Sequence, residues 1–364
     1  GREIVDFSAG QPDVPSPAVA IDAACEALAA GKTRYTAAAG IPELRRAIAR
    51  RYRDTYGALW SESDVVVTVG AKAALYEVMQ ILLDDGDEVI LPTPAWVSFS
   101  EQIQLAGARP VTVPMSGDDG FTLHAEPLIA ACTERTRMIL VNSPSNPTGG
   151  VATADDLERL AAVAAERDVV LLCDETYERF VWQGEHASGA SLAARWPEHV
   201  AVVGSFSKTW SMTGWRLGWL AGPRQLVDKV GELQSHLTSN PTAFAMYGGL
   251  AALEGADEAV ERMRSVFAQR RELMVDGLAR LDGVHCRPPA GAFYAFPDVS
   301  SVYGGAVSDS ISFAERLLQD HGVATVPGAA FGSDHHVRLS FACSQDELRQ
   351  GLERMADALA ALRP

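Results

Sequence analysis

One lysine stands among small residues in the stretch from Ser205 to Gly218, and an arginine, Arg216, follows it within the same stretch. Small neighbours such as Ser205 and Ser207 leave room for a bulky group on Lys208, and their hydroxyls are able to bind phosphate oxygens. Arg216 adds a planar guanidinium fork for the same phosphate. The stretch therefore predicts a lysine that is accessible to a phosphorylated ligand, whereas the alternative is a surface lysine beside a buried strand arginine.

A carboxylate at the end of a buried strand is the second candidate for chemistry. Asp174 closes the apolar run 169–173, and ligands of open α/β sheets bind beyond the carboxyl ends of the strands. Tyr177 follows on the same segment, so its hydroxyl is available to the same ligand. An acidic residue in such a position is often only a cap for the next helix, and Lys208 after a nearby strand favours the functional interpretation.

Two loops that join a strand to a helix supply further polar groups. Gly70, Ala71 and Lys72 lie between a predicted strand and a predicted helix, where backbone N–H groups at the positive helix end favour a phosphate. Asn146 opens an Asn-Pro-Thr-Gly turn after another predicted strand, and taken alone this is an ordinary turn. Both loops are candidates for ligand binding because each lies between a strand and a helix and occurs together with the other motifs.

An arginine in a short apolar strand is a further candidate. A charged side chain at Arg338 needs a partner inside such a strand, and the alternative is a structural salt bridge. Trp96 follows a predicted strand and is by position as easily a core residue. The adjacent His335 and His336 point to opposite faces of a strand, so we expect no shared metal ion and no metal site.

From residue 64 onward, short β-branched runs alternate with helical patterns, which predicts a mostly parallel sheet with helices on both faces. A long helical stretch runs from Pro241 toward Leu281, and Gly283, Pro288 and Pro289 then break it. The break predicts a domain boundary, followed by a smaller α+β pattern. In the first part the predicted strands are 65–69, 88–91, 109–113, 138–141, 169–173 and 200–203, and the predicted helices include 71–83 and 153–167.

Composition and charge exclude several classes of protein. The 364 residues carry a net charge of −16, which opposes nonspecific binding to nucleic acids or to anionic membranes. The five cysteines are odd in number and scattered, which fits reduced thiols in a cytoplasmic protein. No apolar run reaches the length of a membrane span, and no G-x-G-x-x-G motif supports a nicotinamide enzyme.

Taken together, the lysine stretch, the Asp174-Glu175-Thr176-Tyr177 run and the Asn146-Pro147-Thr148-Gly149 turn resemble the motifs of class I and II aminotransferases, which are fold type I pyridoxal-phosphate enzymes. The resemblance covers essentially the whole chain. It implies an α/β protein whose large cofactor-binding domain, residues 18–280, carries a mostly parallel seven-stranded sheet between helices. It also implies a smaller, discontinuous α+β domain made of residues 1–17 and 281–364.

The resemblance also implies roles for individual residues. Lys208 holds pyridoxal 5′-phosphate as a Schiff base and then moves a proton as general base and acid. Asp174 keeps the ring nitrogen of the cofactor charged, and Tyr177 donates to its phenolic oxygen. Because one phosphate contact comes from the neighbouring subunit, a homodimer with shared sites is expected. The other cofactor-binding residues are expected to be Asn146, Trp96, Gly70, Ala71, Lys72, Ser205, Arg216 and, across the subunits, Tyr35.

For the substrate, the resemblance implies transfer of an amino group between an L-amino acid and a 2-oxo acid. Arg338 is expected to grip the α-carboxylate in a bidentate pair. Lys72 resembles the lysine that binds a distal carboxylate in the bacterial aspartate/prephenate subgroup, and the segment 237–242 holds no arginine for that task. Aspartate or glutamate is thus favoured, with prephenate or an aromatic or neutral amino acid as further options. The substrate-binding residues are expected to be Arg338, Gly10, Asn146, Trp96 and Lys72.

Two other functions stay open at the level of the sequence. The same scaffold carries lyases, so a pyridoxal-phosphate β-lyase that acts on cysteine conjugates is the first alternative. The second is an aminotransferase-like regulatory domain that binds DNA. That function needs an added helix-turn-helix domain and a basic surface, and this sequence shows neither.

Overall fold

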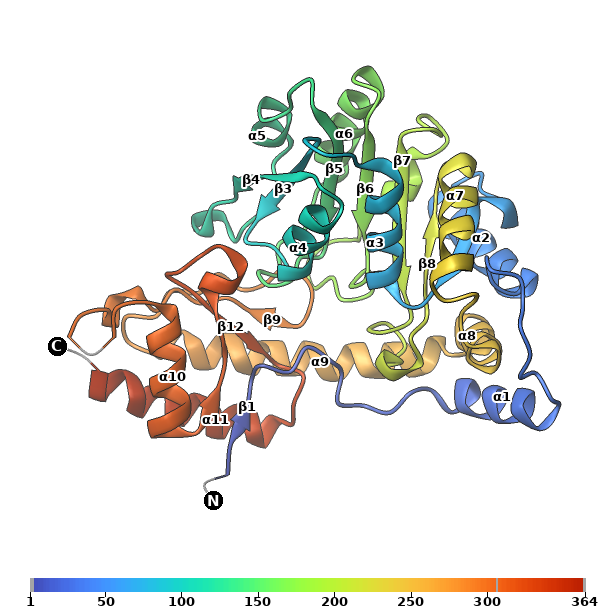
Figure 1. Cartoon of the computed structure of the whole chain (residues 1–364). Helices are drawn as coiled ribbons and strands as arrows, with labels where there is room; N and C mark the ends of the chain where they lie inside the picture. Colours follow the sequence, from blue (N-terminus) through green and yellow to red (C-terminus); the bar gives the residue numbers. More distant parts are fainter. Residues whose placement is uncertain (1–2, 306, 363–364) are drawn as a thin grey trace.

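A seven-stranded sheet forms the centre of the computed structural model, which describes residues 3–305 and 307–362 (Figure 1). The strand order is β2-β8-β7-β6-β5-β3-β4, and β8 runs antiparallel to its two neighbours while the other pairs are parallel. The predicted mostly parallel sheet is therefore confirmed. Its strands are β2 Val65–Thr68, β3 Glu88–Thr93, β4 Arg109–Pro114, β5 Thr136–Asn142, β6 Val170–Asp174, β7 Val200–Ser205 and β8 Gly218–Ala221.

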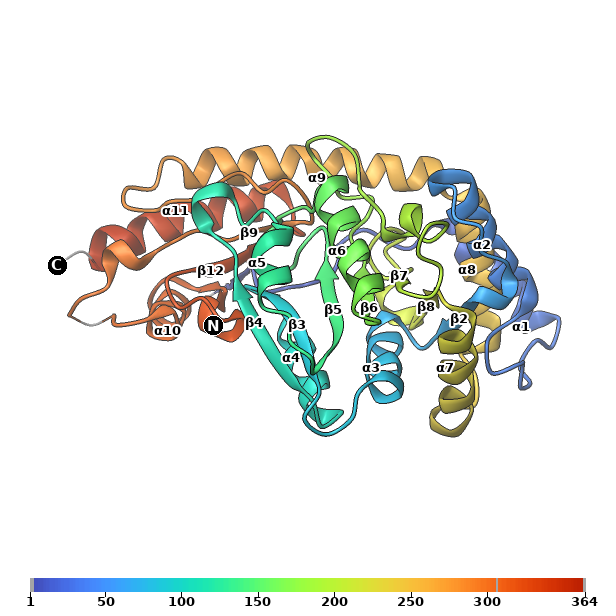
Figure 2. The same ribbon diagram turned by 90° about the horizontal axis from the view of Figure 1, so that it is seen from above.

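Helices cover both faces of this sheet (Figure 2). Side chains of a strand alternate between the faces, so Val66 joins the hydrophobic cluster of one face, and Val65 and Val67 join the cluster of the other. Burial on both faces explains why the strands are continuous apolar runs. The first face is covered by α3 Ala71–Leu82, α4 Val97–Leu105 and α7 Arg224–Leu237, and the second by α2 Pro42–Tyr56, α5 Ala125–Ala130 and α6 Ala154–Glu166.

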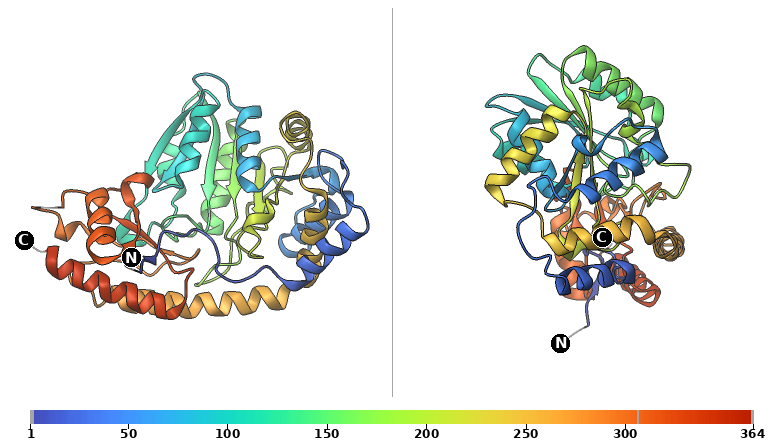
Figure 3. Two further views of the ribbon diagram at one scale, coloured as in Figure 1. Left: turned by 60° about the horizontal axis from the view of Figure 1, so that its bottom comes forward. Right: turned by 90° about the vertical axis from the view of Figure 1, so that its right-hand side faces the viewer.

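The C-terminal part of the chain forms a smaller unit together with the first residues (Figure 3). The N-terminal strand β1 pairs in parallel with β10, and Phe7 packs in the same hydrophobic cluster as Phe293, Phe313 and Leu348. A second small sheet has the order β11-β12-β9 and is antiparallel. The elements are β1 Val5–Asp6, β9 Tyr294–Ala295, α10 Ser310–His321, β10 Val323–Ala324, β11 Val326–Pro327, β12 Val337–Ser340 and α11 Gln345–Leu362.

Helix α9, Asp257–Leu278, passes beneath the sheet and continues into the smaller unit (Figure 1). The sequence predicted a long helical stretch from Pro241 toward Leu281, and the structure divides this stretch into two helices, because α8, Ala243–Gly255, ends before α9 begins. Ala256 leaves the helical conformation at φ −104° and ψ 10°, and the acidic residues at the start of α9 favour a new helix N-terminus there. Helix α1, Ala18–Ala29, packs against α8.

The parallel strands place their carboxyl ends at the edge of the sheet that faces the smaller unit. The register pairs Asn142, the last residue of β5, with Asp174, the last residue of β6. Ser205 ends β7 on the other side of β6. Within the described residues, no helix is long and apolar enough to cross a membrane.

Candidate functional site

A cavity of about 410 Å³ lies at the carboxyl ends of β5, β6 and β7, beside β9 and β12 of the smaller unit. It collects residues from segments that are far apart in the chain, which the sequence had singled out one by one. Of the predicted site residues, those that line it are Gly10, Ala71, Lys72, Trp96, Asn146, Asp174, Tyr177, Ser205, Lys208, Arg216 and Arg338.

Lys208 follows β7 and reaches into this cavity. Its Nζ donates a hydrogen bond of 2.6 Å to the carbonyl oxygen of Gly10, which lies on the segment after β1. Burial lowers the pKa of Lys208 to about 8, and the nearby cations of Arg216 and Arg338 act in the same direction. The amine therefore loses its proton far more readily than an ordinary lysine does, which is what a nucleophile or a proton carrier needs.

Asp174 presents a buried carboxylate on the same cavity. Burial raises its pKa to about 6, although hydrogen bonds from Thr176, including one of 3.1 Å from its backbone N–H, lower it. The backbone around this carboxylate is fixed, because Asn142 Nδ2 and the Ser143 N–H both donate to the Asp174 carbonyl oxygen, at 3.1 and 3.2 Å. Among the described residues, no cation lies within ion-pair distance of this carboxylate. The position thus suits a cationic group of a ligand.

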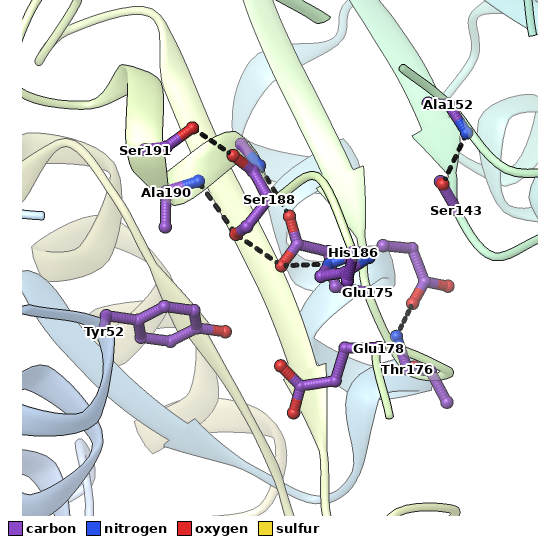
Figure 4. A network of polar contacts seen from close by, with 12 residues as sticks. Tyr52, Ser143, Ala152, Glu175, Thr176, Glu178, His186, Ser188, Ala190 and Ser191 are labelled. Atoms are coloured by element: carbon purple, nitrogen blue, oxygen red, sulfur yellow. Dashed lines mark hydrogen bonds and ion pairs between the residues drawn. The ribbon is translucent and has the colours of Figure 1, made fainter. Parts of the chain in front are cut away.

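A buried polar cluster supports the turn that follows Asp174, and the sequence had not indicated it (Figure 4). Glu175 accepts a hydrogen bond of 2.7 Å from the Ser188 hydroxyl, and its carboxylate lies 3.2 Å from His186 Nε2. Arg51 of α2 forms an ion pair of 2.7 Å with Glu178. Burial by itself lowers the pKa of His186, but the charge of Glu175 raises it above its ordinary value. The cluster therefore joins the turn after Asp174 to helix α2 through Glu178, and to His186 and Ser188 through Glu175.

The predicted phosphate loop lies against Arg216. Gly70 has a φ of +82°, and a Cβ on it would lie 2.5 Å from Arg216 Nη2, so a larger residue would displace the guanidinium. Arg216 is held by a hydrogen bond of 2.8 Å from its Nη1 to the Thr213 carbonyl oxygen. The N-terminus of α3 has no side-chain cap, so its first N–H groups remain for an anion, with the Ser205 hydroxyl beside them.

Arg338 presents a second guanidinium group to the cavity, in addition to that of Arg216. Its Nη1 donates to Asn146 Oδ1 at 3.0 Å, and its Nη2 donates to the Ser8 carbonyl oxygen at 2.8 Å. Its Nε is buried and has no hydrogen-bond partner among the described residues. The alternative of a structural salt bridge is not supported, because these partners are neutral. A buried cation with a free N–H group suits a carboxylate of a ligand.

Lys72 and Trp96 lie together at the cavity wall. The Lys72 Nζ lies 4.6 Å from the centre of the Trp96 indole, which is a cation–π distance. Trp96 is half-buried and its ring contacts Phe99 edge-on, so one side of the indole is anchored in the core. The ammonium group therefore has a preferred place without an acidic partner among the described residues, and it remains available to an anionic ligand.

Two predicted residues do not line the cavity. Gly70 lies just behind its wall, as described above, and Tyr35 is 86% exposed on the surface of the chain. His336 stacks on the ring of Phe296, and its Nδ1 lies 2.8 Å from the Ser333 hydroxyl, while His335 contacts Tyr303. Residues 3–305 and 307–362 contain no group of three or more metal-binding side chains that could hold an ion.

Three further residues line the cavity whose roles the sequence had not indicated, namely Asn142, Thr176 and Tyr294. Asn142 joins two motifs, because its Oδ1 accepts from the Asn146 N–H at 2.9 Å while its amide group holds Asp174. A polar residue that ends an apolar strand was the available signal for Asn142. For Tyr294 the signal was a tyrosine within the apolar run 292–296, because a buried hydroxyl needs a partner.

Comparisons with known proteins show to which family the chain is similar. The family model of aminotransferase class I and II matches residues 2–355. The aspartate aminotransferase of Geobacillus stearothermophilus is 41% identical over 98% of this chain and 91% of its own. The aspartate/prephenate aminotransferase of Thermus thermophilus is 41% identical over 99% of this chain and 92% of its own. Among solved structures, Thermus thermophilus aspartate aminotransferase with maleate gives a TM-score of 0.93 at 41% identity, over 98% of this chain and 92% of that one. The structure of Rhizobium meliloti aspartate aminotransferase gives a TM-score of 0.95 at 38% identity, over 99% of this chain and 92% of that one.

In the ligand-free protein, we expect the rate at which Lys208 reacts with acetic anhydride to reach half of its maximum near pH 8, because its pKa is lowered to about 8. A lysine with a lowered pKa is a free amine above that pH and is protonated below it. The exposed Lys229, whose pKa is raised by Glu232, is the control, and its rate should still rise at about pH 10. Competitive labelling followed by mass spectrometry measures both. A Lys208 profile that coincides with that of Lys229 contradicts the expected shift.

Proposed function

The chain belongs to the class I and II aminotransferase family and is an aminotransferase, and on this basis we propose that its cavity binds pyridoxal 5′-phosphate and prefers aspartate or glutamate as amino donor. One observation carries the proposal: the Lys208 amine and the Asp174 carboxylate line one cavity, with pKa values moved to about 8 and about 6. The relatives named above are aspartate or aspartate/prephenate aminotransferases, so the β-lyase and the regulatory domain are not favoured.

The residues of the cavity fit this cofactor. The Gly70 backbone, the free N-terminus of α3, Ser205 and Arg216 offer a place for its phosphate, and a Cβ at Gly70 would displace the Arg216 guanidinium. The unpaired carboxylate of Asp174 suits its ring nitrogen, while Tyr177, Asn146 and Trp96 remain for its other atoms. When bound, pyridoxal phosphate withdraws electrons from the bonds at the substrate α-carbon.

The side chains of this protein then divide the remaining work. Arg338 binds the substrate α-carboxylate through its free N–H groups, assisted by Asn146 and by the backbone at Gly10. Lys208 takes the proton from the α-carbon and later returns it, because its lowered pKa makes the neutral amine available at moderate pH. Asp174 remains ionised and holds a positive charge in a buried place.

Replacement of the lysine tests the proposed function most simply. We expect Lys208→Ala to abolish covalent attachment of pyridoxal phosphate and to lower the transamination rate by roughly a thousand-fold or more, because one side chain serves as anchor and as proton carrier. The surface variant Lys229→Ala should keep wild-type activity. Borohydride reduction followed by peptide mapping identifies the attachment site. A reduced cofactor on any other lysine, or full activity of Lys208→Ala, refutes the proposal.

We infer that Lys72 receives the distal carboxylate of aspartate or glutamate. Its ammonium group lies at the cavity wall over Trp96 and forms no ion pair with the residues that the structure describes. The chain as a whole carries a net charge of −16, so an anionic side chain has to be attracted by local positive charge such as this. The names of the relatives support an acidic amino acid as substrate, and the same lysine is compatible with the second carboxylate of prephenate.

Substrate comparison in one variant tests this role of Lys72. We expect Lys72→Ala to raise KM for aspartate roughly ten-fold or more and to change KM for alanine little, because a hydrogen bond between two charged groups is worth about 1.5–3 kcal/mol. Half-reactions followed by cofactor absorbance give both constants, with Lys229→Ala as control. Equal changes for the two substrates place Lys72 outside substrate recognition and favour a neutral or aromatic donor.

The quaternary structure is proposed to be a homodimer with shared sites in the cytoplasm. Tyr35 is 86% exposed and does not line the cavity of its own chain, which fits a contact with the phosphate site of a second copy. Each subunit is proposed to consist of a large domain, 18–280, and a small domain, 1–17 and 281–364, and the pairing of β1 with β10 supports this division.

Sedimentation velocity at assay concentrations tests the dimer. We expect a single species of twice the chain mass of 38.9 kDa, because each site would need Tyr35 from the other copy. The Tyr35→Phe variant should sediment in the same way, since it loses only a hydroxyl. A monomer with full activity contradicts the shared site.

A further inference from the structure

Tyr294 contacts both Tyr177, which is proposed to bind the cofactor, and Arg338, which is proposed to bind the substrate carboxylate. The proposed function gives Tyr294 itself no role. It belongs to β9, which pairs with β12, the strand that carries Arg338 (Figure 1). Its side chain is 1% exposed, and that small exposed surface lines the cavity. Its hydroxyl oxygen lies 2.8 Å from that of Tyr177. Tyr294 thus touches both the tyrosine and the arginine that the site uses.

The two hydroxyls hold two protons but form one hydrogen bond with each other. Burial raises the pKa of both Tyr177 and Tyr294, so both remain protonated at neutral pH. Whichever hydroxyl donates, the other keeps a proton that has no acceptor among the described residues. A buried hydroxyl without a partner costs free energy, so this second proton is directed to an acceptor on a ligand.

The two tyrosines differ in acidity. The guanidinium carbon of Arg338 lies 4.5 Å from the centre of the Tyr294 ring, and its positive charge lowers the pKa of both tyrosines. The contact between the two hydroxyls raises the pKa of Tyr177 and lowers that of Tyr294, so Tyr294 is the better proton donor of the pair and Tyr177 accepts. The proton of Tyr177 is then the one left for the ligand.

The ring of Tyr294 also fixes the arginine. The Arg338 guanidinium contacts this ring and, at 5.2 Å, the ring of Phe331, so two aromatic groups hold it, and no carboxylate of the described residues forms an ion pair with it. The hydrogen bonds to Asn146 and Ser8 use Nη1 and Nη2 and leave Nε buried without a partner among the described residues. The aromatic contacts therefore help to keep the guanidinium in the orientation that a carboxylate requires.

We propose that Tyr294 is a positioning residue that joins the two ends of the site. Its hydroxyl directs the Tyr177 proton toward the phenolic oxygen of the cofactor, and its ring holds Arg338 for the substrate carboxylate. The inference rests on the proposed function, which assigns these partners to Tyr177 and Arg338. It extends that function by making Tyr294 contribute to both through different atoms, so the two contributions separate under mutation.

Four variants separate the hydroxyl from the ring. Tyr294→Phe removes the hydroxyl alone, Tyr294→Leu removes both, and Tyr177→Phe with the double variant Tyr177→Phe/Tyr294→Phe tests whether the hydroxyls act in one chain. Tyr303→Phe is the matched control, because its hydroxyl donates to the Asp334 carbonyl oxygen at 2.6 Å away from the cavity. Circular dichroism checks folding, and Tyr294→Met replaces the leucine variant if that one fails to fold.

The first measurement is the pH at which the absorbance of the bound cofactor changes. Loss of a hydrogen bond to the phenolic oxygen raises that pH, because the deprotonated form loses a donor. We expect Tyr294→Phe to shift the midpoint upward by about half a pH unit to one unit, and the double variant to match Tyr177→Phe alone. A wild-type midpoint in Tyr294→Phe, or additive shifts in the double variant, overturns the hydroxyl link.

The second measurement is the Kd for maleate, a dicarboxylate that does not react, determined by calorimetry with and without cofactor. We expect Tyr294→Leu to weaken binding roughly ten-fold or more and Tyr294→Phe to weaken it by less than about three-fold, since the phenyl ring keeps the contact with Arg338. Wild-type affinity in Tyr294→Leu overturns the ring contact. Failure of the proposed function has a different signature, because the wild-type protein would then show no cofactor absorbance while maleate binding still decides the role of the ring.

Discussion

The unpaired carboxylate of Asp174 is the constraint on which the rest of the site depends. It is 4% exposed at the end of β6, its pKa is raised to about 6 by burial, and at neutral pH it is ionised without a cation beside it among the described residues. A buried charge of this kind costs free energy until a positive group pairs with it. The amide groups of Asn142 and Ser143 hold the backbone there, so the carboxylate is unable to escape to solvent.

The same cavity also contains an excess of positive charge. Lys208, Arg216 and Arg338 all line it, in a chain whose net charge is −16. Their mutual repulsion adds to burial in lowering the pKa of Lys208, so the lysine is the cation that gives up its proton. The structure thus prepares a site for a ligand that has a positive group at one end and anionic groups at the other. The reactive amine is a consequence of that charge distribution, and Tyr294 couples its two sides.

Sequence analysis predicted the parts that depend on local patterns. β-branched runs predicted most strands of the sheet, and the residues that follow them, Asp174 and Lys208, reach one cavity because parallel strands share an edge. The antiparallel strand β8 was not predicted, and only its first residue, Gly218, belongs to the stretch around Lys208. The contact of Tyr294 with Tyr177 and the ion pair of Arg51 with a distant glutamate were also missed, because pairings between remote segments leave no periodic signal in one sequence.

The most direct test of this account is the titration of the Asp174 carboxyl carbon by ¹³C nuclear magnetic resonance, assigned with the Asp174→Asn variant. In the protein without cofactor we expect a midpoint near pH 6, the value to which burial raises the pKa. With pyridoxal phosphate bound, a positive ring nitrogen would stabilise the carboxylate, and the midpoint should fall well below that value. A midpoint at the ordinary value of about 4 without cofactor, or one that does not move when cofactor binds, would contradict the central role given to this unpaired charge.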